Sequence, residues 1–164
     1  MAETRYILFL LDEQKYGMQL TKISSIEEVY NVVPIPVGVQ YIKGIIHLRN
    51  TVIPIYDLKA KFGMYDSSMS STRQLLIAET HGMSIAFEVD QVLGIMDVPE
   101  TNIKEMPPVV KNEDTGCLES VLKIDSVTDG NADIVISVNI DKLMSDSEFE
   151  DVSVALESPE TEED

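Results

Sequence analysis

Two short apolar strands with a tight turn between them are encoded by Gly44-Ile45-Ile46-His47-Leu48-Arg49-Asn50-Thr51-Val52-Ile53-Pro54-Ile55-Tyr56-Asp57-Leu58. Arg49 and Asn50 occupy the turn, and asparagine tolerates the positive φ that two-residue hairpin turns need. Pro54 predicts that the second strand lies at a sheet edge, because proline cannot donate a hydrogen bond to a ladder. The run places one cation at a turn beside an apolar edge, which is typical of a docking surface rather than a reaction centre.

Short elements are expected on both sides of this hairpin. Apolar residues predict two antiparallel strands at residues 5–11 and 15–20, joined by a polar turn. A helical turn is expected over residues 21–26, whose two isoleucines lie three apart. After the hairpin, residues 57–62 favour a short helix that ends at Gly63.

The second half of the chain repeats this pattern after a polar linker at residues 64–72. Residues 74–79 and 83–89 predict a hairpin like the N-terminal one, and residues 134–140 resemble residues 52–58. Two copies of about five short strands are each too small for a large core, which favours two small barrels packed on one another. The sequence therefore predicts a mainly β protein built by internal duplication.

The charge of the chain excludes some partners. The formal net charge is −17, which repels phosphate backbones and anionic membrane surfaces, so neither nucleic acid nor a membrane is expected as a partner. Residues 145–164 hold nine acidic residues and no lysine or arginine, and we expect them to form a disordered acidic tail. Only four residues could give part of this tail an apolar face: Phe149, Val152, Val154 and Leu156.

The cellular location expected from the sequence is the cytoplasm. The longest apolar runs are too short to span a bilayer, and the N-terminus shows no basic region followed by a long apolar stretch. Cys117 is the only cysteine and cannot form an internal disulfide, which fits a reducing compartment.

Catalytic chemistry is not expected. Asp114-Thr115-Gly116 resembles the tripeptide of aspartic proteases, but polar residues flank it where that class has apolar strands, so a solvated loop is the better interpretation. Cys117 is expected to be a small buried residue at a strand start. His47 and His81 lie in different halves, and their spacing suggests no metal site. We expect no catalytic residue, no cofactor and no metal ion.

The hairpin sequence resembles the signature of CheW-like domains, the coupling modules of bacterial and archaeal chemotaxis arrays. That signature is roughly Gly-x-Ile-x-Leu-Arg-Gly, three residues, Pro, two residues and Asp-Leu. The residues that fit it are Gly44, Ile46, Leu48, Arg49, Pro54, Asp57 and Leu58. Asn50 stands where the family usually has glycine, and His47 where it often has asparagine.

The resemblance implies a fold and a function. The fold would be two SH3-like five-stranded β-barrel subdomains around a shared core, with a few short helices, in one domain over residues 1–144. Subdomain one would span about 15–70, with the N-terminal strand a candidate for exchange, and subdomain two about 72–144. The function would be a non-catalytic adaptor that couples methyl-accepting chemoreceptors to the histidine kinase CheA at the inner face of the membrane.

The resemblance also implies partner-binding residues. Arg49 matches an arginine that contributes to contacts within the receptor–kinase array, and arginine is enriched in interface hot spots. Ile23, Gly44 and Ile95 match positions that line a groove between the barrels, where the tip of a chemoreceptor docks. Ser25 stands where the family commonly has glutamate, which bears on partner specificity.

Three alternatives remain open from the sequence. Arg49 could be an exposed turn residue with a weak surface ion pair, and Ile23 and Ile95 could be ordinary core residues. The chain could be a CheW-like module that serves another two-component pathway. It could also be a small β-barrel protein that binds a ligand in a polar pocket.

Overall fold

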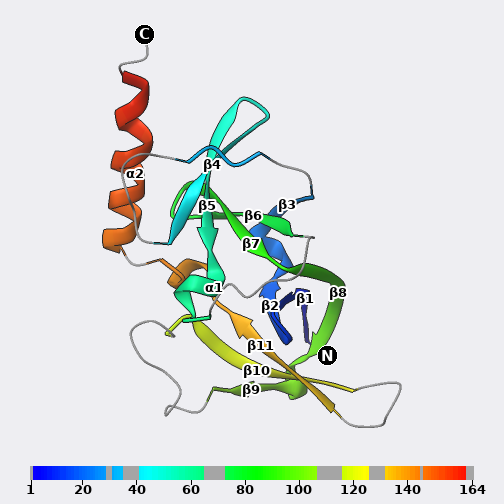
Figure 1. The fold of residues 1–164 in the computed structure, drawn as a ribbon. Helices are drawn as coiled ribbons and strands as arrows, with labels where there is room; N and C mark the ends of the chain where they lie inside the picture. The colour runs from blue at the N-terminus through cyan, green and yellow to red at the C-terminus, as the bar shows by residue number, and fades with distance from the viewer. Residues whose placement is uncertain are drawn as a thin grey trace.

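The structure is a computed structural model that describes residues 2–28, 31–34, 41–64, 73–106, 116–125, 132–144 and 146–161. Its strands form two sheets (Figure 1). The first sheet has the order β8-β1-β2-β11-β10-β9 and the second β3-β6-β7-β5-β4. The mainly β fold with a few short helices is confirmed, although the first sheet has six strands rather than five and the strand order closes neither sheet.

The bounds of the strands are β1 Glu3–Leu11, β2 Gln14–Gln19, β3 Ile23–Glu27, β4 Ile42–Leu48, β5 Thr51–Asp57, β6 Gln74–Thr80, β7 Met83–Val89, β8 Gln91–Pro99, β9 Ile103–Glu105, β10 Leu118–Asp125 and β11 Ala132–Val138. The α-helices are α1 Leu58–Lys61 and α2 Asp146–Thr161, and short 3₁₀ helices are η1 Leu20–Lys22, η2 Glu100–Asn102 and η4 Ile140–Lys142.

Internal duplication is visible in the order of the strands. The order β8-β1-β2-β11-β10 in the first sheet corresponds, strand by strand, to β3-β6-β7-β5-β4 in the second. In each sheet, one strand of a hairpin pairs in parallel with a strand from elsewhere in the chain: β2 pairs with the later strand β11, and β7 pairs with the earlier strand β5. Each hairpin then sends the next strand into the other sheet, so β3 pairs with β6 and β8 pairs with β1. The two halves exchange edge strands.

This exchange changes the expected subdomain bounds. We expected subdomains at about 15–70 and 72–144, but β6 and β7 belong to the sheet of β3–β5, and β2 belongs to the sheet of β8–β11. The largest core cluster holds buried side chains of both sheets, such as Phe9 and Met18 of the first and Tyr56 and Phe87 of the second. Exchanged strands and a shared core make the two halves one cooperative unit.

The short helix predicted at residues 57–62 is present as α1. The Asp57 carboxylate accepts a hydrogen bond from the Ala60 amide at 3.1 Å, and Gly63 beyond the helix has φ +75°. The second half repeats this cap, because Asn139 Oδ1 accepts a hydrogen bond from the Asp141 amide at 3.0 Å at the start of η4. The same device ends the parallel strand in both halves.

The helical turn predicted over residues 21–26 is present only at residues 21 and 22, and the prediction is wrong for residues 23–26. The chain forms the 3₁₀ helix η1 and then enters strand β3 at Ile23. The three-residue spacing of Ile23 and Ile26 resembles that of a helix, but β3 contains a bulge between Ile23 and Ser25, which makes the residue count along the strand irregular.

Strand β5, which contains Pro54, lies between β7 and β4. The prediction that Pro54 marks a sheet edge is therefore wrong for this strand. The partner of Pro54 in β4 is Ile45, whose backbone N–H and C=O both bond to Val33 on the other side. The pair of Ile45 and Pro54 therefore needs no amide from Pro54. β7 begins to pair with β5 only at Ile55. The missing N–H therefore faces the side of β7, where Pro54 has no partner in the ladder.

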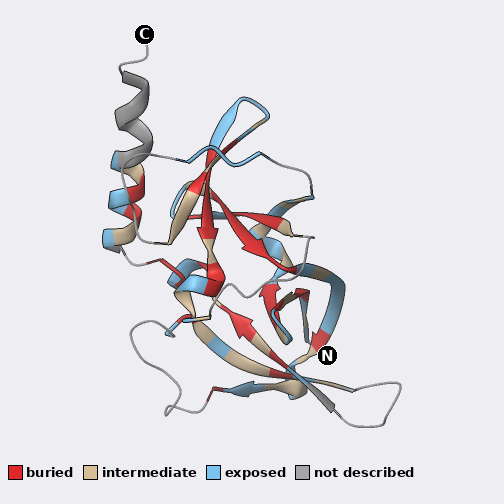
Figure 2. Cartoon of the chain, in the orientation of Figure 1, coloured by how far each residue is buried: buried red, intermediate tan, exposed pale blue. Residues whose placement is uncertain are grey.

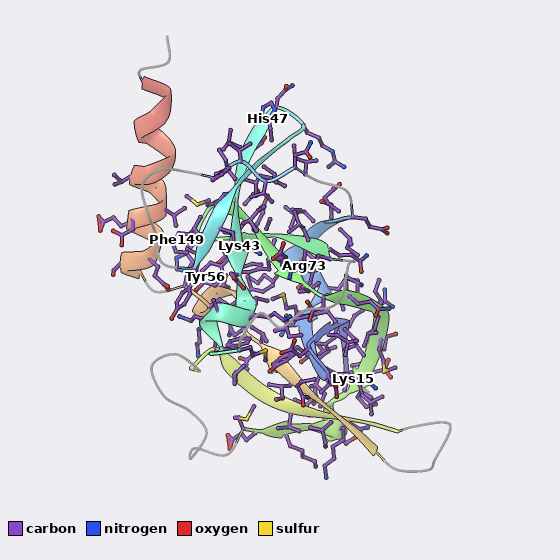
Figure 3. All side chains as sticks on the ribbon, viewed as in Figure 1. Lys15, Lys43, His47, Tyr56, Arg73 and Phe149 are labelled. Carbon is purple, nitrogen blue, oxygen red and sulfur yellow. The ribbon has the colours of Figure 1, made fainter. Side chains whose placement is uncertain are left out.

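The acidic C-terminal segment differs from the disordered tail that we expected, because residues 146–161 form helix α2. Phe149 and Val152 are buried in the shared core, and the Phe149 ring lies 4.1 Å from the His81 ring. Figure 3 shows Phe149 on the side of α2 that faces Tyr56. The Tyr56 hydroxyl donates to Glu148 at 3.4 Å. Docking of one apolar stripe outweighs the like charge along the helix.

Two polar clusters tie the short helices to the exchanged strands. In the first, Lys59 of α1 lies 2.9 Å from Asp12 and 3.0 Å from Asp90. In the second, Asp141 of η4 accepts hydrogen bonds from Lys22 at 2.9 Å and from the Thr80 hydroxyl at 2.8 Å. We call them the Lys59 cluster and the Asp141 cluster.

We predict that Asp141→Asn destabilises the protein at neutral pH but not in acid. The hydrogen bond from Lys22, and then that from Thr80, hold the pKa of Asp141 below its ordinary value. Stabilisation by the charged carboxylate is therefore present above the unfolded pKa and is lost as pH falls through the lower folded pKa. Because the pair is half exposed, the deficit of the variant is at most about 1 kcal/mol. Urea unfolding at pH 7 and near pH 3 checks this, and an equal deficit at both pH values would contradict it.

Some predictions fall outside the described residues. These are the polar linker from residue 65 onward, and Asp114 and Thr115 of the protease-like tripeptide. In the described part of the chain, no helix is long and apolar enough to cross a membrane.

Candidate functional site

The β4–β5 hairpin presents Arg49 at its tip, as the sequence predicted. Leu48 pairs with Thr51, and the two residues between them have φ +50° at Arg49 and +65° at Asn50. Positive φ at both central positions defines a type I′ turn, which favours asparagine and glycine. An arginine there costs about 1 kcal/mol of backbone strain. Among the described residues Arg49 has no hydrogen-bond or ion-pair partner, and its side chain is exposed.

Exposed valines lie on this hairpin and beside it. Val52 follows the turn and is 45% exposed, and Val33 is 54% exposed on a short segment that pairs with Ile45. Val32 beside it is 39% exposed. We call Arg49, Asn50, Val52, Val33 and Val32 the hairpin surface. A cation at the tip of a hairpin that also carries exposed β-branched side chains is typical of a protein-binding patch.

Gly44 does not line an open groove. The structure buries it beneath the segment 31–34, where a Cβ would lie 2.6 Å from the Val33 carbonyl oxygen and 2.8 Å from Val32 Cγ1. A small residue is required at a close backbone approach, as the sequence suggested, but the approaching backbone belongs to this chain. Gly44 therefore allows the segment that carries Val32 and Val33 to pack closely on β4.

We predict that Gly44→Ala lowers the free energy of unfolding by about 1.5 kcal/mol, because the new methyl group overlaps backbone that can move only by releasing the Val33 bridge. Gly17→Ala is the matched control. There the added Cβ meets only side-chain ends, the nearest being Leu8 at 3.3 Å, so a smaller loss is expected. Urea unfolding of both variants checks this, and equal losses would contradict it.

Edge strand β8 carries the second apolar surface. Leu93, Ile95 and Met96 are 40%, 57% and 37% exposed, and we call them the β8 surface. β8 pairs with β1 on one side only, and a bulge opposite Leu8 and Phe9 interrupts that pairing. Figure 2 shows most of β8 as exposed. Ile95, which the sequence assigned to partner binding, therefore does not have the core position that was its alternative.

Edge strand β3 is the counterpart of β8 in the other half, and it carries Ile23 and Ser25. Ile23 is half-buried against the shared core, so part of its side chain serves core packing. Ser25 is half-buried opposite Ile77. The bulges of β3 and β8 fall at corresponding positions, which makes Ile26 the counterpart of Ile95. Ile26 is 40% exposed.

The structure therefore divides the predicted site residues between two regions. Arg49 lies at the hairpin tip, at the top of Figure 1, whereas β3 and β8 lie along its right-hand side. Sequence reasoning missed six exposed apolar residues, which are Ile26, Val32, Val33, Val52, Leu93 and Met96. The repeat could have identified one of them, because it aligns Val52 with Ile134, which is also exposed.

The cysteine and the two histidines do not lie in surroundings that would support catalysis or metal binding. Cys117 is buried directly before β10, and burial raises the pKa of its thiol to about 11, so the thiol is protonated at neutral pH. His47 is exposed on β4, and His81 packs on Phe149. A search of the described residues finds no group of three His, Cys, Asp or Glu side chains that could hold a metal ion.

An open hollow of about 430 Å³ beside β1 is the candidate for a ligand pocket, lined by Glu3, Arg5, Leu20, Thr21 and Asp97. Arg5 Nε donates to Asp97 Oδ1 at 2.7 Å, and this bond holds the pKa of Asp97 below its ordinary value. Because the two charges satisfy each other, the hollow offers little to orient a ligand.

Known proteins are similar to this chain in sequence and in fold. The model of the CheW-like domain matches residues 5–148. "Chemotaxis protein CheW" of Bacillus subtilis is 24% identical over 132 residues, covering 78% of this chain and 85% of the relative, and the Treponema pallidum protein of the same name is 24% identical over 148 residues, covering 88% and 84%. The crystal structure of scaffolding protein TtCheW from Thermoanaerobacter tengcongensis has TM-score 0.74 and 28% identity, and the likeness covers 84% of this chain and 89% of that chain. A match over most of the length, on a fold with the same arrangement, shows that the chain belongs to the CheW-like domain family.

Proposed function

We propose that this protein is a non-catalytic chemotaxis adaptor that couples methyl-accepting chemoreceptors to the histidine kinase CheA and biases the kinase between active and inactive states. The observation that carries this proposal is the presence of two separate exposed apolar surfaces on one domain of the CheW-like family. The relatives are named chemotaxis and scaffolding proteins, which supports the same role. In this proposal the protein acts in the cytoplasm at receptor arrays.

The hairpin surface is the proposed contact for the kinase regulatory domain. Arg49 offers a planar guanidinium that can meet a carboxylate or backbone carbonyls in two parallel hydrogen bonds. Its strained backbone and its lack of a partner in the described part of the chain both favour a role outside the fold. The neighbouring valines would exclude water around those hydrogen bonds.

The β8 surface, together with Ile23, Ser25 and Ile26 of β3, is the proposed contact for the receptor tip. A helical hairpin docks by laying an apolar stripe against aliphatic walls, and these edge strands supply such residues. Ser25 replaces the glutamate common in the family and would remove one charge from this contact. Modest affinity at each surface is enough, because an array makes many contacts at once.

Binary titrations test this assignment. We predict that Ile95→Asp weakens binding of a receptor tip fragment by about tenfold or more, because a carboxylate replaces an apolar contact at the centre of the β8 surface. Binding of the CheA regulatory domain should stay within about twofold of the wild-type value.

Ile134→Asp is the matched control, because Ile134 is 47% exposed on β11, outside both proposed surfaces. Calorimetry of each variant with each partner measures the effects. Equal losses for Ile95→Asp and Ile134→Asp would remove the β8 surface from the proposal, and no binding of either partner to the wild type would refute the adaptor function.

A further inference from the structure

We propose that Lys59 is a positioning residue that couples the two docking surfaces, so that a partner on the hairpin surface changes the affinity of the β8 surface. This inference rests on the proposed function, since it assigns regulation to the same two surfaces. It is carried by the Lys59 cluster, in which a buried cation ties the helix that follows β5 to the entrance of β8.

The ammonium of Lys59 is the centre of that cluster. Its Nζ lies 2.9 Å from Asp12 Oδ1 and 3.0 Å from Asp90 Oδ2, and the lysine side chain is only 8% exposed. Burial alone would lower the pKa of Lys59, but the two carboxylates outweigh that effect and raise it, so the cation is retained. A buried cation shared by two carboxylates is hard to separate from either of them.

Asp90 holds the entrance to β8. It is the single residue between β7 and β8, and its amide donates to the Leu10 carbonyl at 3.0 Å. Its carboxylate also accepts a hydrogen bond from the Asp12 amide at 2.6 Å. Two residues later, the Val92 amide donates to Gln74 Oε1 at 2.7 Å. The backbone before Leu93 and Ile95 is therefore fixed by polar contacts in addition to the packing of Val92 against the shared core.

The other side of the cluster leads to the hairpin surface. Strand β5 begins at Thr51, directly after Arg49 and Asn50, and passes into α1 at Leu58 without a loop. Leu58 is fully buried, and Asp57 caps the helix. A displacement of the hairpin along β5 would move α1, and with it Lys59, because neither the strand nor the cap contains a flexible joint.

The second half uses the corresponding position in the same way with inverted charge. The strand registers align Lys59 with Asp141, since Asp57 and Asn139 are equivalent caps. Asp141 bonds to Thr80 at the β6–β7 turn and to Lys22, which directly precedes β3. In each half, a helix after the parallel strand is tied to the turn of the other hairpin and to the entrance of an exchanged strand. The two clusters have central residues of opposite charge but join the corresponding three elements of the fold. What the two halves share is therefore the link between these elements and not the sign of the charge.

Coupling of this kind is measurable as a free energy between two binding events, and it is reciprocal. The affinity of the CheA regulatory domain is measured by calorimetry with and without a saturating receptor tip fragment. The ratio of the two affinities is the coupling factor. For the wild type we expect a factor of about five or more in either direction.

Lys59→Met tests the assignment, because methionine keeps the apolar stem and removes the charge. We expect its coupling factor to fall to about one, while each partner alone still binds. Lys61→Met is the matched control on the same helix. The Lys61 side chain is 9% exposed, but it contacts Tyr41 and Glu148 instead of the entrance to β8, so its coupling factor should equal that of the wild type.

A coupling factor of one in the wild type, or an unchanged factor in Lys59→Met, would overturn the inference while leaving the adaptor function intact. If neither partner binds, the adaptor function fails separately. Amide hydrogen exchange of the chain alone then still decides whether Lys59 positions β8. Faster exchange in β8 for Lys59→Met, but not for Lys61→Met, is expected, and unchanged exchange in β8 would refute the positioning role.

Discussion

Phe149→Ala is expected to lower the free energy of unfolding by about 3 kcal/mol, although Phe149 lies in the most acidic part of the sequence. The ring is 8% exposed, belongs to the shared core and packs on His81 with 4.1 Å between ring centroids. Its loss removes one of the two buried apolar side chains among the described residues 147–154 of α2, the other being Val152. Urea unfolding followed by circular dichroism measures the effect.

Val154→Ala is the control on the same helix. Val154 is 61% exposed, so its truncation should change the free energy of unfolding by less than about 0.5 kcal/mol. If Phe149→Ala were as mild as Val154→Ala, α2 would not be docked in solution, and the disordered tail expected from composition would be the correct description.

Replacing Arg49 with asparagine is expected to have opposite effects on folding and on binding. Asparagine tolerates the φ of +50°, so the free energy of unfolding should rise by about 0.5 kcal/mol. Affinity for the CheA regulatory domain should fall by about thirtyfold, or 2 kcal/mol, because the guanidinium at the tip of the hairpin surface is lost. Urea unfolding and calorimetry measure the two quantities on the same sample.

Asn50→Gly is the matched variant in the neighbouring position. It keeps the arginine and installs the residue that the family usually has, so the turn should be as stable or more so with affinity unchanged. An Arg49→Asn protein that binds as tightly as the wild type would remove Arg49 from the interface. A variant that binds weakly because it unfolds more easily would assign Arg49 a structural role instead.

Local signals in the sequence predicted much of the structure. The turn at Arg49-Asn50, the cap at Asp57, the two similar hairpins and the buried Cys117 all follow from residue types at short spacing. Each depends on backbone conformations or burial that neighbouring residues dictate.

Features that depend on long-range pairing were not predictable. The exchange of β3 and β8 between the sheets has no local signature, and neither the interior position of Pro54 nor the bulge in β3 could be recognised without it. Helix α2 was missed because charge dominates its composition, whereas its docking depends on Phe149 and Val152 finding the core. The Lys59 cluster joins residues from three separate segments, so only the fold brings them together.

The central claim is that one domain engages a receptor and a kinase on two different surfaces at the same time. Size-exclusion chromatography of the chain, a receptor tip fragment and the CheA regulatory domain tests it directly, with the two partners alone as the control. We expect one species that contains all three components and forms only when the chain is present. Two binary complexes that exclude one another, with the kinase domain displacing the receptor fragment, would contradict it.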